Sequence, residues 1–197
     1  MLHLYLIRHA EAVPRGDPNY EEDERPLTDA GRAEARRLGA ALAAHGIRFD
    51  VMLSSPLPRA RQTAEELIQG YGTGAPPLEF VDELAPDAKP KKLDRVMLKH
   101  DCDAIAVVGH QPDLGDYAGR LIGSRKASVD LEKPGVACIA CEDPPGKGCG
   151  ALLWLVTPAW YNPAAGQPPA AAADEPALYA GGRRRRREAD VRVEDGA

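Results

Sequence analysis

The stretch Leu2-His3-Leu4-Tyr5-Leu6-Ile7-Arg8-His9-Ala10-Glu11-Ala12 decides the fold of this chain. An apolar run ends abruptly at Arg8 and His9, and a polar loop follows. This pattern is typical of a buried strand that carries functional side chains at its carboxyl end. Open α/β sheets bind their ligands in a crevice at that end of the strands. We therefore predict that Arg8 and His9 lie in such a crevice.

The composition is that of an ordinary globular protein. Its 197 residues are 44% hydrophobic and 28% charged, with a net charge of -5, and they suffice for one domain with a substantial core. The acidic balance argues against a general nucleic-acid or membrane surface. No apolar run approaches the roughly 18 residues that span a bilayer, and no signal-peptide pattern is visible. We expect a cytoplasmic protein without nucleic-acid or membrane partners.

Strand-like and helix-like segments alternate along the chain, which predicts a mostly parallel sheet covered on both faces. Thr28 is the expected N-cap of the first helix, and Gly46 its C-terminal stop. The last two strands would form a hairpin. The expected strands after the first are 50–54, 78–81, 103–108, 136–141 and 151–157, and the expected helices begin near residues 28, 58, 90 and 113. The predicted fold class is a three-layer α/β/α domain with a C-terminal β-hairpin.

Three of these strand ends carry residues suited to an anion. They are Arg8-His9, the Ser54–Arg59 segment and Gly109-His110. Parallel strands bring their carboxyl ends to one edge of a sheet, where two histidines and two arginines would be costly without an anionic ligand. Arginine binds phosphate oxygens as a permanently charged planar fork. Nearby cations also keep a histidine neutral and nucleophilic. The combination predicts a phosphoryl site.

The same three segments resemble the motifs of the histidine phosphatase superfamily, which includes the cofactor-dependent phosphoglycerate mutases. The resemblance covers about residues 1 to 157, and it implies the phosphoglycerate mutase-like fold. Within the superfamily the chain is most similar to the SixA-type phosphohistidine phosphatases. The small size, the Arg25–Gly31 stretch and the absence of a large inserted cap support this assignment.

The resemblance implies a role for each matching residue. His9 would attack phosphorus and become a transient phosphohistidine, while Arg8 and Arg59 would hold the non-bridging oxygens. His110 would hydrogen-bond the same group, and Arg25 matches a substrate-binding position near the pocket. Water would then release phosphate. The scheme needs no metal and no other cofactor.

Glu83 is the expected counterpart of the superfamily's general acid, and it is assigned here to substrate binding. An exposed loop carboxylate is an equally good interpretation of this residue. A phosphohistidine substrate demands less of a dedicated acid, because its imidazole leaves readily once it is protonated. Glu83 therefore does not decide the substrate.

Three functions remain open. The first is a metal-independent protein phosphohistidine phosphatase, whose partner is a phosphorylated protein such as a histidine phosphotransfer domain. The second is a small-molecule phosphomonoesterase or a phosphoglycerate-mutase-like enzyme, which acts on a phosphorylated metabolite. The third is a non-catalytic phospho-binding module, against which the complete Arg-His-Arg-His set argues.

Two further features lie outside the motifs. Cys138, Cys141 and Cys149 are close in sequence, but they lack the repeated pair pattern of a zinc site, and we expect free thiols. The domain is predicted to cover residues 1–157. Residues 158–197 are rich in Ala, Pro, Gly and Arg and are predicted to form a flexible tail. Its Arg183–Arg187 run is interpreted as solvated, with binding to nucleic acid or to an acidic partner as the alternative.

Overall fold

The computed structural model describes residues 1–162, apart from 88, 125–126, 128 and 143–144. The strands are β1 (Leu2–Arg8), β2 (Val51–Ser54), β3 (Leu78–Phe80), β4 (Ala104–Gly109), β5 (Val136–Cys141) and β6 (Gly150–Val156). The helices are α1 (Asp29–Ala44), α2 (Pro58–Tyr71), α3 (Pro90–Met97), α4 (Asp113–Leu121), α5 (Pro158–Tyr161) and the 3₁₀ helix η1 (Asp82–Leu84). Among the described residues, no helix combines the length and the apolarity that a bilayer crossing requires.

The six strands form one mixed sheet in the order β3-β2-β4-β1-β5-β6. β1 is central, with β4 parallel on one side and β5 antiparallel on the other. β2 is parallel to both β4 and β3, whereas β5 and β6 form the antiparallel hairpin. The carboxyl ends of β1, β2 and β4 consequently lie at the same edge. This topology confirms the predicted mostly parallel sheet with a C-terminal hairpin.

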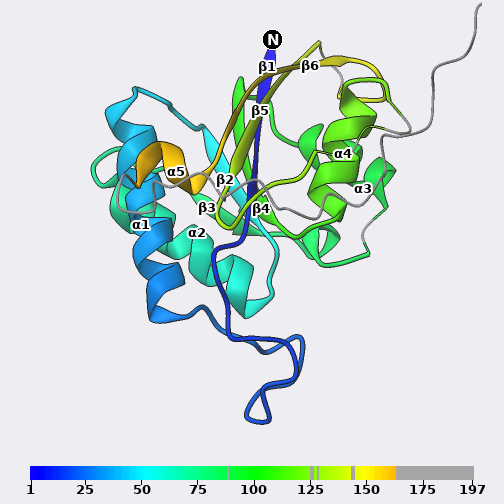
Figure 1. Ribbon diagram of the computed structural model, residues 1–197. Coiled ribbons are helices and arrows are strands. Elements are labelled where there is room, and N and C mark those ends of the chain that lie inside the picture. Colours follow the sequence, from blue (N-terminus) through cyan, green and yellow to red (C-terminus); the bar gives the residue numbers. More distant parts are fainter. Residues whose placement is uncertain (88, 125–126, 128, 143–144, 163–197) are drawn as a thin grey trace, which may run out of the picture. The chain divides into compact units, whose positions relative to one another are not determined.

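Helices cover both faces of the sheet, which makes three layers (Figure 1). Alternate residues of β1 enter two separate cores, as expected for a strand buried on both faces. Leu4 and Leu6 pack in the core that includes residues of α3 and α4. Tyr5 and Ile7 pack in the core that includes residues of α1 and α2. Of the two helices that cover this second face, α2 carries Arg59.

The first two helices pack unusually close together. Thr28 begins α1 as its N-cap, with its hydroxyl accepting the Gly31 N–H at 3.0 Å, as predicted. The helix ends before Gly46, whose φ of +73° is the left-handed conformation that glycine adopts without strain. A Cβ on Gly39 would lie 2.1 Å from the Leu67 carbonyl oxygen. Glycine thus lets the backbones of α1 and α2 touch.

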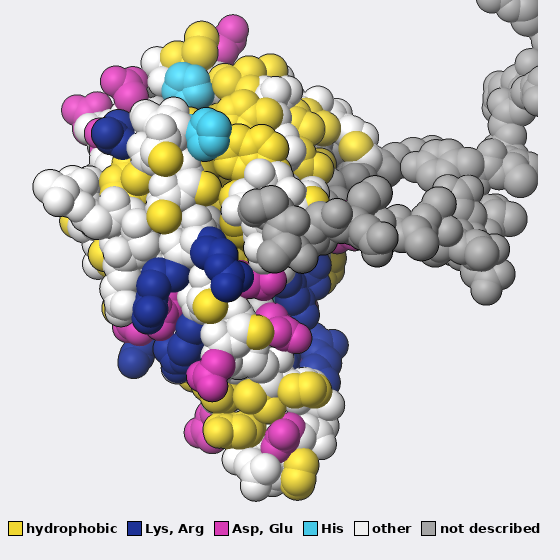
Figure 2. Space-filling model, turned by 60° about the vertical axis from the view of Figure 1, so that its left-hand side comes forward, with side chains coloured by type: hydrophobic (Ala, Val, Ile, Leu, Met, Phe, Trp, Pro, Cys, Tyr) yellow, Lys and Arg dark blue, Asp and Glu magenta, His cyan; other side chains and the backbone are white. Residues whose placement is uncertain are grey.

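The segment between β1 and α1 projects beyond the end of the sheet (Figure 1). A bridge between Ala12 and Leu27 and the hydrogen bond from Val13 N–H to Pro26 O (2.9 Å) close its base. Figure 2 shows acidic and basic side chains intermixed in the lower part of the face it displays, whereas hydrophobic side chains gather in the upper part. The projecting segment is therefore a charged addition next to the strand ends, not part of the core.

The C-terminal region differs in detail from the prediction. The sequence places the start of the tail at Pro158, but residues 158–161 form the short helix α5. Trp160 stacks on His45 with ring centroids 4.4 Å apart, and the Tyr161 hydroxyl donates to the Pro134 carbonyl at 2.8 Å. These aromatic contacts hold α5 on the domain. Residues 163–197, including the Arg183–Arg187 run, lie outside the described residues.

Candidate active site

His9 follows directly after the central strand and is buried, with 7% of its surface exposed. Its backbone N–H donates to the Gly109 carbonyl at 3.0 Å, which ties it to the end of β4. Its Nδ1 lies 2.7 Å from the Ala10 carbonyl oxygen. A carbonyl only accepts, so Nδ1 carries the hydrogen, and in the neutral ring Nε2 keeps a free lone pair. Nε2 is thus the ring nitrogen that can act on a ligand with its lone pair.

Burial keeps His9 in that neutral form. Its pKa is lowered to about 3, mainly by desolvation and to a smaller extent by the cations of Arg59, Lys133 and Arg8. The hydrogen bond to Ala10 acts in the opposite direction but is outweighed. A neutral imidazole among fixed cations is chemically suited to attack an electrophilic phosphorus.

Two arginines lie beside His9 and are held by backbone carbonyls. Arg8 Nη1 donates to Leu131 O at 2.6 Å. Arg59, in the first turn of α2, is only 3% exposed, and its Nη1 donates to Glu22 O at 3.0 Å. In both residues Nε has no hydrogen-bond partner within the described part of the chain. Arg8 has a long ion pair with the exposed Asp130, with Nη1 and Oδ1 3.9 Å apart, whereas Arg59 has no ion pair among the described residues. Both side chains thus keep a free Nε donor for an anionic ligand.

His110 completes the group from the end of β4. Its ring centroid is 5.2 Å from that of His9, and its Nε2 is 2.9 Å from the Ser55 hydroxyl. Burial lowers the pKa of His110 to about 3, with further contributions from His9 and Arg59. The structure therefore brings Arg8, His9, Arg59 and His110 together at one sheet edge, as the sequence predicts.

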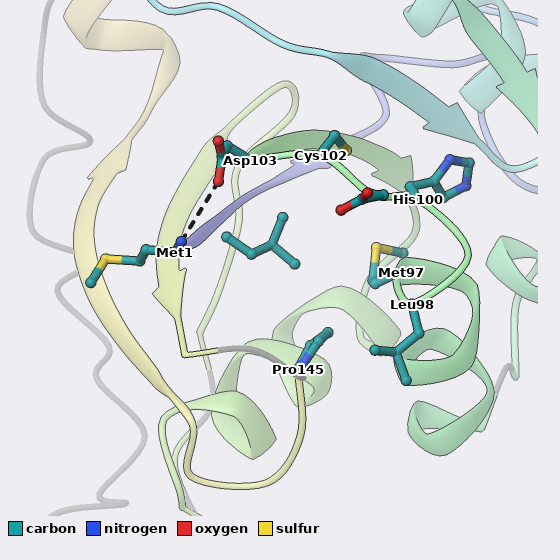
Figure 3. Close-up of a pocket in the computed structure, with 9 residues that line it drawn as sticks. Met1, Met97, Leu98, His100, Cys102, Asp103 and Pro145 are labelled. Carbon is teal, nitrogen blue, oxygen red and sulfur yellow. Dashed lines mark ion pairs between the residues drawn. The ribbon is translucent and has the colours of Figure 1, made fainter.

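These side chains line a single cavity of about 670 Å³, a size typical of small-molecule sites. Its polar lining residues are Arg8, His9, Arg15, Glu22, Asp23, Arg25, Arg59, Asp87, His110, Gln111, Asp113 and Lys133. A second cavity, of about 440 Å³, lies at the other end of β1 around Met1 and Asp103, whose ion pair spans 3.6 Å (Figure 3). It contains none of the predicted site residues.

Arg25 also lines the main cavity, but its guanidinium is already occupied. It is 6% exposed and forms a bidentate ion pair with Glu22, with Nε and Nη2 at 3.0 and 2.6 Å from the carboxylate oxygens. Its Nη1 donates to Val13 O at 2.6 Å. Arg25 thus fixes the projecting segment beside His9, and it can reach an anion only in exchange for Glu22.

Glu83 is not among the residues that line this cavity. It lies on η1, at the end of β3, and lines a separate cavity with Lys99 and His100. Four other carboxyl groups do line the cavity, those of Glu22, Asp23, Asp87 and Asp113, and Asp113 lies at the start of α4. Burial raises the pKa of Asp113. Nothing in the motif pattern distinguishes Asp113 from an ordinary helix-start acid.

Sequence reasoning also missed the residues that support His9. Thr63 Oγ1 accepts the Ala10 N–H at 3.0 Å and donates to Arg59 O at 2.6 Å, so one hydroxyl links the loop after His9 to α2. Ser55 is completely buried beneath His110. Both residues belong to the Ser54–Thr63 segment, and their position in that motif is the only signal that could have identified them.

The cysteines lie away from the cavity. Cys138 and Cys141 are buried free thiols of β5, and burial raises the pKa of Cys138 to about 11. Among the described residues, no cluster of three or more His, Cys, Asp or Glu side chains is arranged to hold a metal ion.

Solved structures share this fold. The protein histidine phosphatase SixA complexed with tungstate superposes with a TM-score of 0.70 at 22% identity, over 80% of this chain and 98% of that one. A putative alpha-ribazole-5'-P phosphatase from Escherichia coli gives a TM-score of 0.61 at 23% identity, over 80% and 97%. The architecture is therefore that of the phosphoglycerate mutase-like α/β enzymes.

Sequence comparisons identify the family. The model of the histidine phosphatase superfamily (branch 1) matches residues 4–85. An uncharacterized protein of Picosynechococcus sp. is 34% identical over 187 residues, covering 82% of this chain and all of that protein. A 2,3-bisphosphoglycerate-dependent phosphoglycerate mutase of Azorhizobium caulinodans is 46% identical over 77 residues, 35% of this chain and 34% of the mutase. The chain belongs to the histidine phosphatase superfamily.

Proposed function

We propose that this protein is a metal-independent phosphatase that removes the phosphoryl group from phosphohistidine in a protein, with His9 as the nucleophile. The hydrogen bond from His9 Nδ1 to the Ala10 carbonyl carries the proposal, because it leaves Nε2 unprotonated in a cationic cavity. Arg8, Arg59 and His110 are assigned to the phosphoryl oxygens, and Arg25 to the surroundings of the substrate.

The proposed reaction has two displacements. In the first, Nε2 of His9 forms a bond to phosphorus while the bond from phosphorus to the substrate nitrogen breaks. The substrate imidazole leaves as a neutral group when its other ring nitrogen is protonated, so no strong acid is required. In the second, water attacks phospho-His9, inorganic phosphate leaves, and the water's second proton passes to solvent. The guanidinium groups of Arg8 and Arg59 stabilise the charge on the equatorial oxygens in both steps.

A second candidate function is hydrolysis of a small phosphomonoester. Asp113 favours it, because this carboxyl group lines the cavity and its raised pKa increases the protonated fraction. A protonated carboxyl group can supply the proton that an alkoxide leaving group needs. The two candidates therefore differ in their dependence on Asp113.

Trapping the intermediate tests the first proposal. Labelled phosphohistidine protein is mixed with the enzyme in EDTA and quenched without acid, which preserves phosphohistidine. Wild type is expected to retain label, and His9→Asn, which keeps a donor for the Ala10 carbonyl, is expected to retain none. Full hydrolysis by His9→Asn would refute the nucleophile. A panel with phosphohistidine protein, 3-phosphoglycerate, sugar phosphates and p-nitrophenyl phosphate then separates the two substrate classes.

A further inference from the structure

Five basic and four acidic side chains line the cavity, and the basic ones differ in whether they already have a partner. Under the proposed function, Arg8, Arg59 and His110 bind that group, and Arg25 is paired with Glu22. Lys133 also lines the cavity, with its side chain exposed to solvent. Within the described residues, no hydrogen bond or ion pair is formed by its ammonium group. Lys133 is therefore a cation at the site that is available to a ligand.

The backbone around Lys133 is fixed on both sides. Arg8 donates twice to this segment, from Nη1 to Leu131 O at 2.6 Å and from its backbone N–H to Gly135 O at 3.1 Å. The Tyr161 hydroxyl donates to Pro134 O at 2.8 Å. These three bonds attach the segment to the end of the central strand and to α5. The backbone that carries Lys133 is thus held beside the cavity before any ligand binds, which reduces the cost of ordering it.

The charges that surround Lys133 indicate what it can bind. Partial burial is the largest cause that lowers its pKa, and Arg8, Arg25 and Arg15 lower it further. Lys133 in turn contributes to the lowered pKa of His9. Mutual repulsion among these cations opposes folding, and an anion placed between them would relieve it. Glu11 opposes this shift of the Lys133 pKa.

We infer that Lys133 binds a second anionic group of the substrate, a carboxylate or phosphate beside the transferred phosphoryl group. The inference rests on the proposed function, and it narrows the substrate class to doubly anionic molecules. In a phosphoprotein the second anion is an acidic side chain next to the phosphohistidine. In a metabolite it is a carboxylate or a second phosphate. The shared chemistry is a charge-assisted bond to the Lys133 ammonium group.

Two matched substrate pairs test the inference. 3-Phosphoglycerate and glycerol 3-phosphate differ by a carboxylate against a hydroxymethyl group. Two phosphohistidine peptides, with either glutamate or glutamine beside the phosphohistidine, form the other pair. Wild type is expected to favour the more anionic member of at least one pair. The pair that shows this preference tells whether the second anion belongs to a phosphoprotein or to a metabolite. Lys133→Met is expected to reduce the preference about tenfold, mainly through KM, whereas Lys133→Arg retains it.

The ratio of kcat/KM between the two members of a pair distinguishes a binding role of Lys133 from a structural role. A merely structural role, or the effect of Lys133 on the His9 pKa, would change kcat/KM equally for both members. An equal change, or no preference in either pair, would overturn the inference. Calorimetric binding of the same pairs to the full chain measures the preference without turnover. A Lys133-dependent binding preference without any hydrolysis would reject the proposed phosphatase function and support the second anion site.

Discussion

Replacing His9 with asparagine should make the protein less sensitive to acid. In the folded protein the pKa of His9 is lowered from 6.5 to about 3, so the folded state remains unprotonated at pH values where the unfolded chain takes up a proton. The stability of the wild type must therefore fall as the pH decreases below about 6.5, and this loss continues until the folded state is itself protonated near pH 3. Asparagine has no such proton to bind.

The size of the effect follows from the shift. Between the unfolded pKa of 6.5 and about pH 5 lie roughly 1.5 pH units, and each contributes about 1.4 kcal/mol. His9 alone should thus cost the wild type about 2 kcal/mol of unfolding free energy between about pH 7 and about pH 5. With only 7% of its surface exposed, His9 is shielded from the solvent screening that would reduce this value.

Urea unfolding of both proteins at the two pH values measures the difference. The wild type should lose about 2 kcal/mol more than His9→Asn, because titration of the carboxylates is common to both proteins and cancels. His110→Gln should behave similarly, since burial lowers the pKa of His110 to about 3 as well. An identical pH dependence in wild type and His9→Asn would show that His9 is not held neutral by the fold.

Three other substitutions examine separate parts of the structure. Thr63→Val leaves the buried Ala10 N–H without its acceptor and should cost about 1–3 kcal/mol in urea unfolding, whereas Thr63→Ser should recover most of that loss. Gly39→Ala places a methyl group 2.1 Å from the Leu67 carbonyl oxygen and should lower stability by about 1–3 kcal/mol or more; an unchanged Tm would contradict the close packing of α1 and α2. Glu83→Gln should leave kcat/KM within about twofold, whereas Asp113→Asn should slow phosphomonoester hydrolysis about 10²-fold or more and phosphohistidine hydrolysis much less. If Glu83→Gln slowed phosphomonoester hydrolysis as much as Asp113→Asn does, Glu83 would again be a candidate for the general acid.

The elements of the sheet could be predicted because each strand is marked by its own sequence. The apolar run before Arg8 and the one before Gly109 are buried on both faces, and such strands are continuous hydrophobic segments. The shared sheet edge then followed from the rule that parallel strands end together. Arg8, His9, Arg59 and His110 were found in this way, since each lies at or just after a strand end.

Residues placed by loops were harder to predict. Glu83 was selected for its position after β3, but a strand end does not fix the direction of the following turn, and η1 carries this side chain to another cavity. Lys133 reaches the site through hydrogen bonds between Arg8 and the backbone at Leu131 and Gly135. Every residue has a backbone carbonyl, so the sequence does not indicate which carbonyls accept such hydrogen bonds. The short helix α5 was missed because its contacts come from two aromatic side chains in an otherwise proline- and alanine-rich stretch.

The central place of β1 in the sheet has a consequence for synthesis of the chain. The ribosome makes β1 first, but both of its neighbours come late, β4 at residues 104–109 and β5 at residues 136–141. One apolar face can pack early against α1 and α2, but the two hydrogen-bonding edges are both filled only when residue 141, about nine tenths of the predicted domain 1–157, has emerged. Long-range pairing of this kind is slow and prone to aggregation. The central strand, which leads directly into His9, should be the part of the nascent protein most in need of a chaperone.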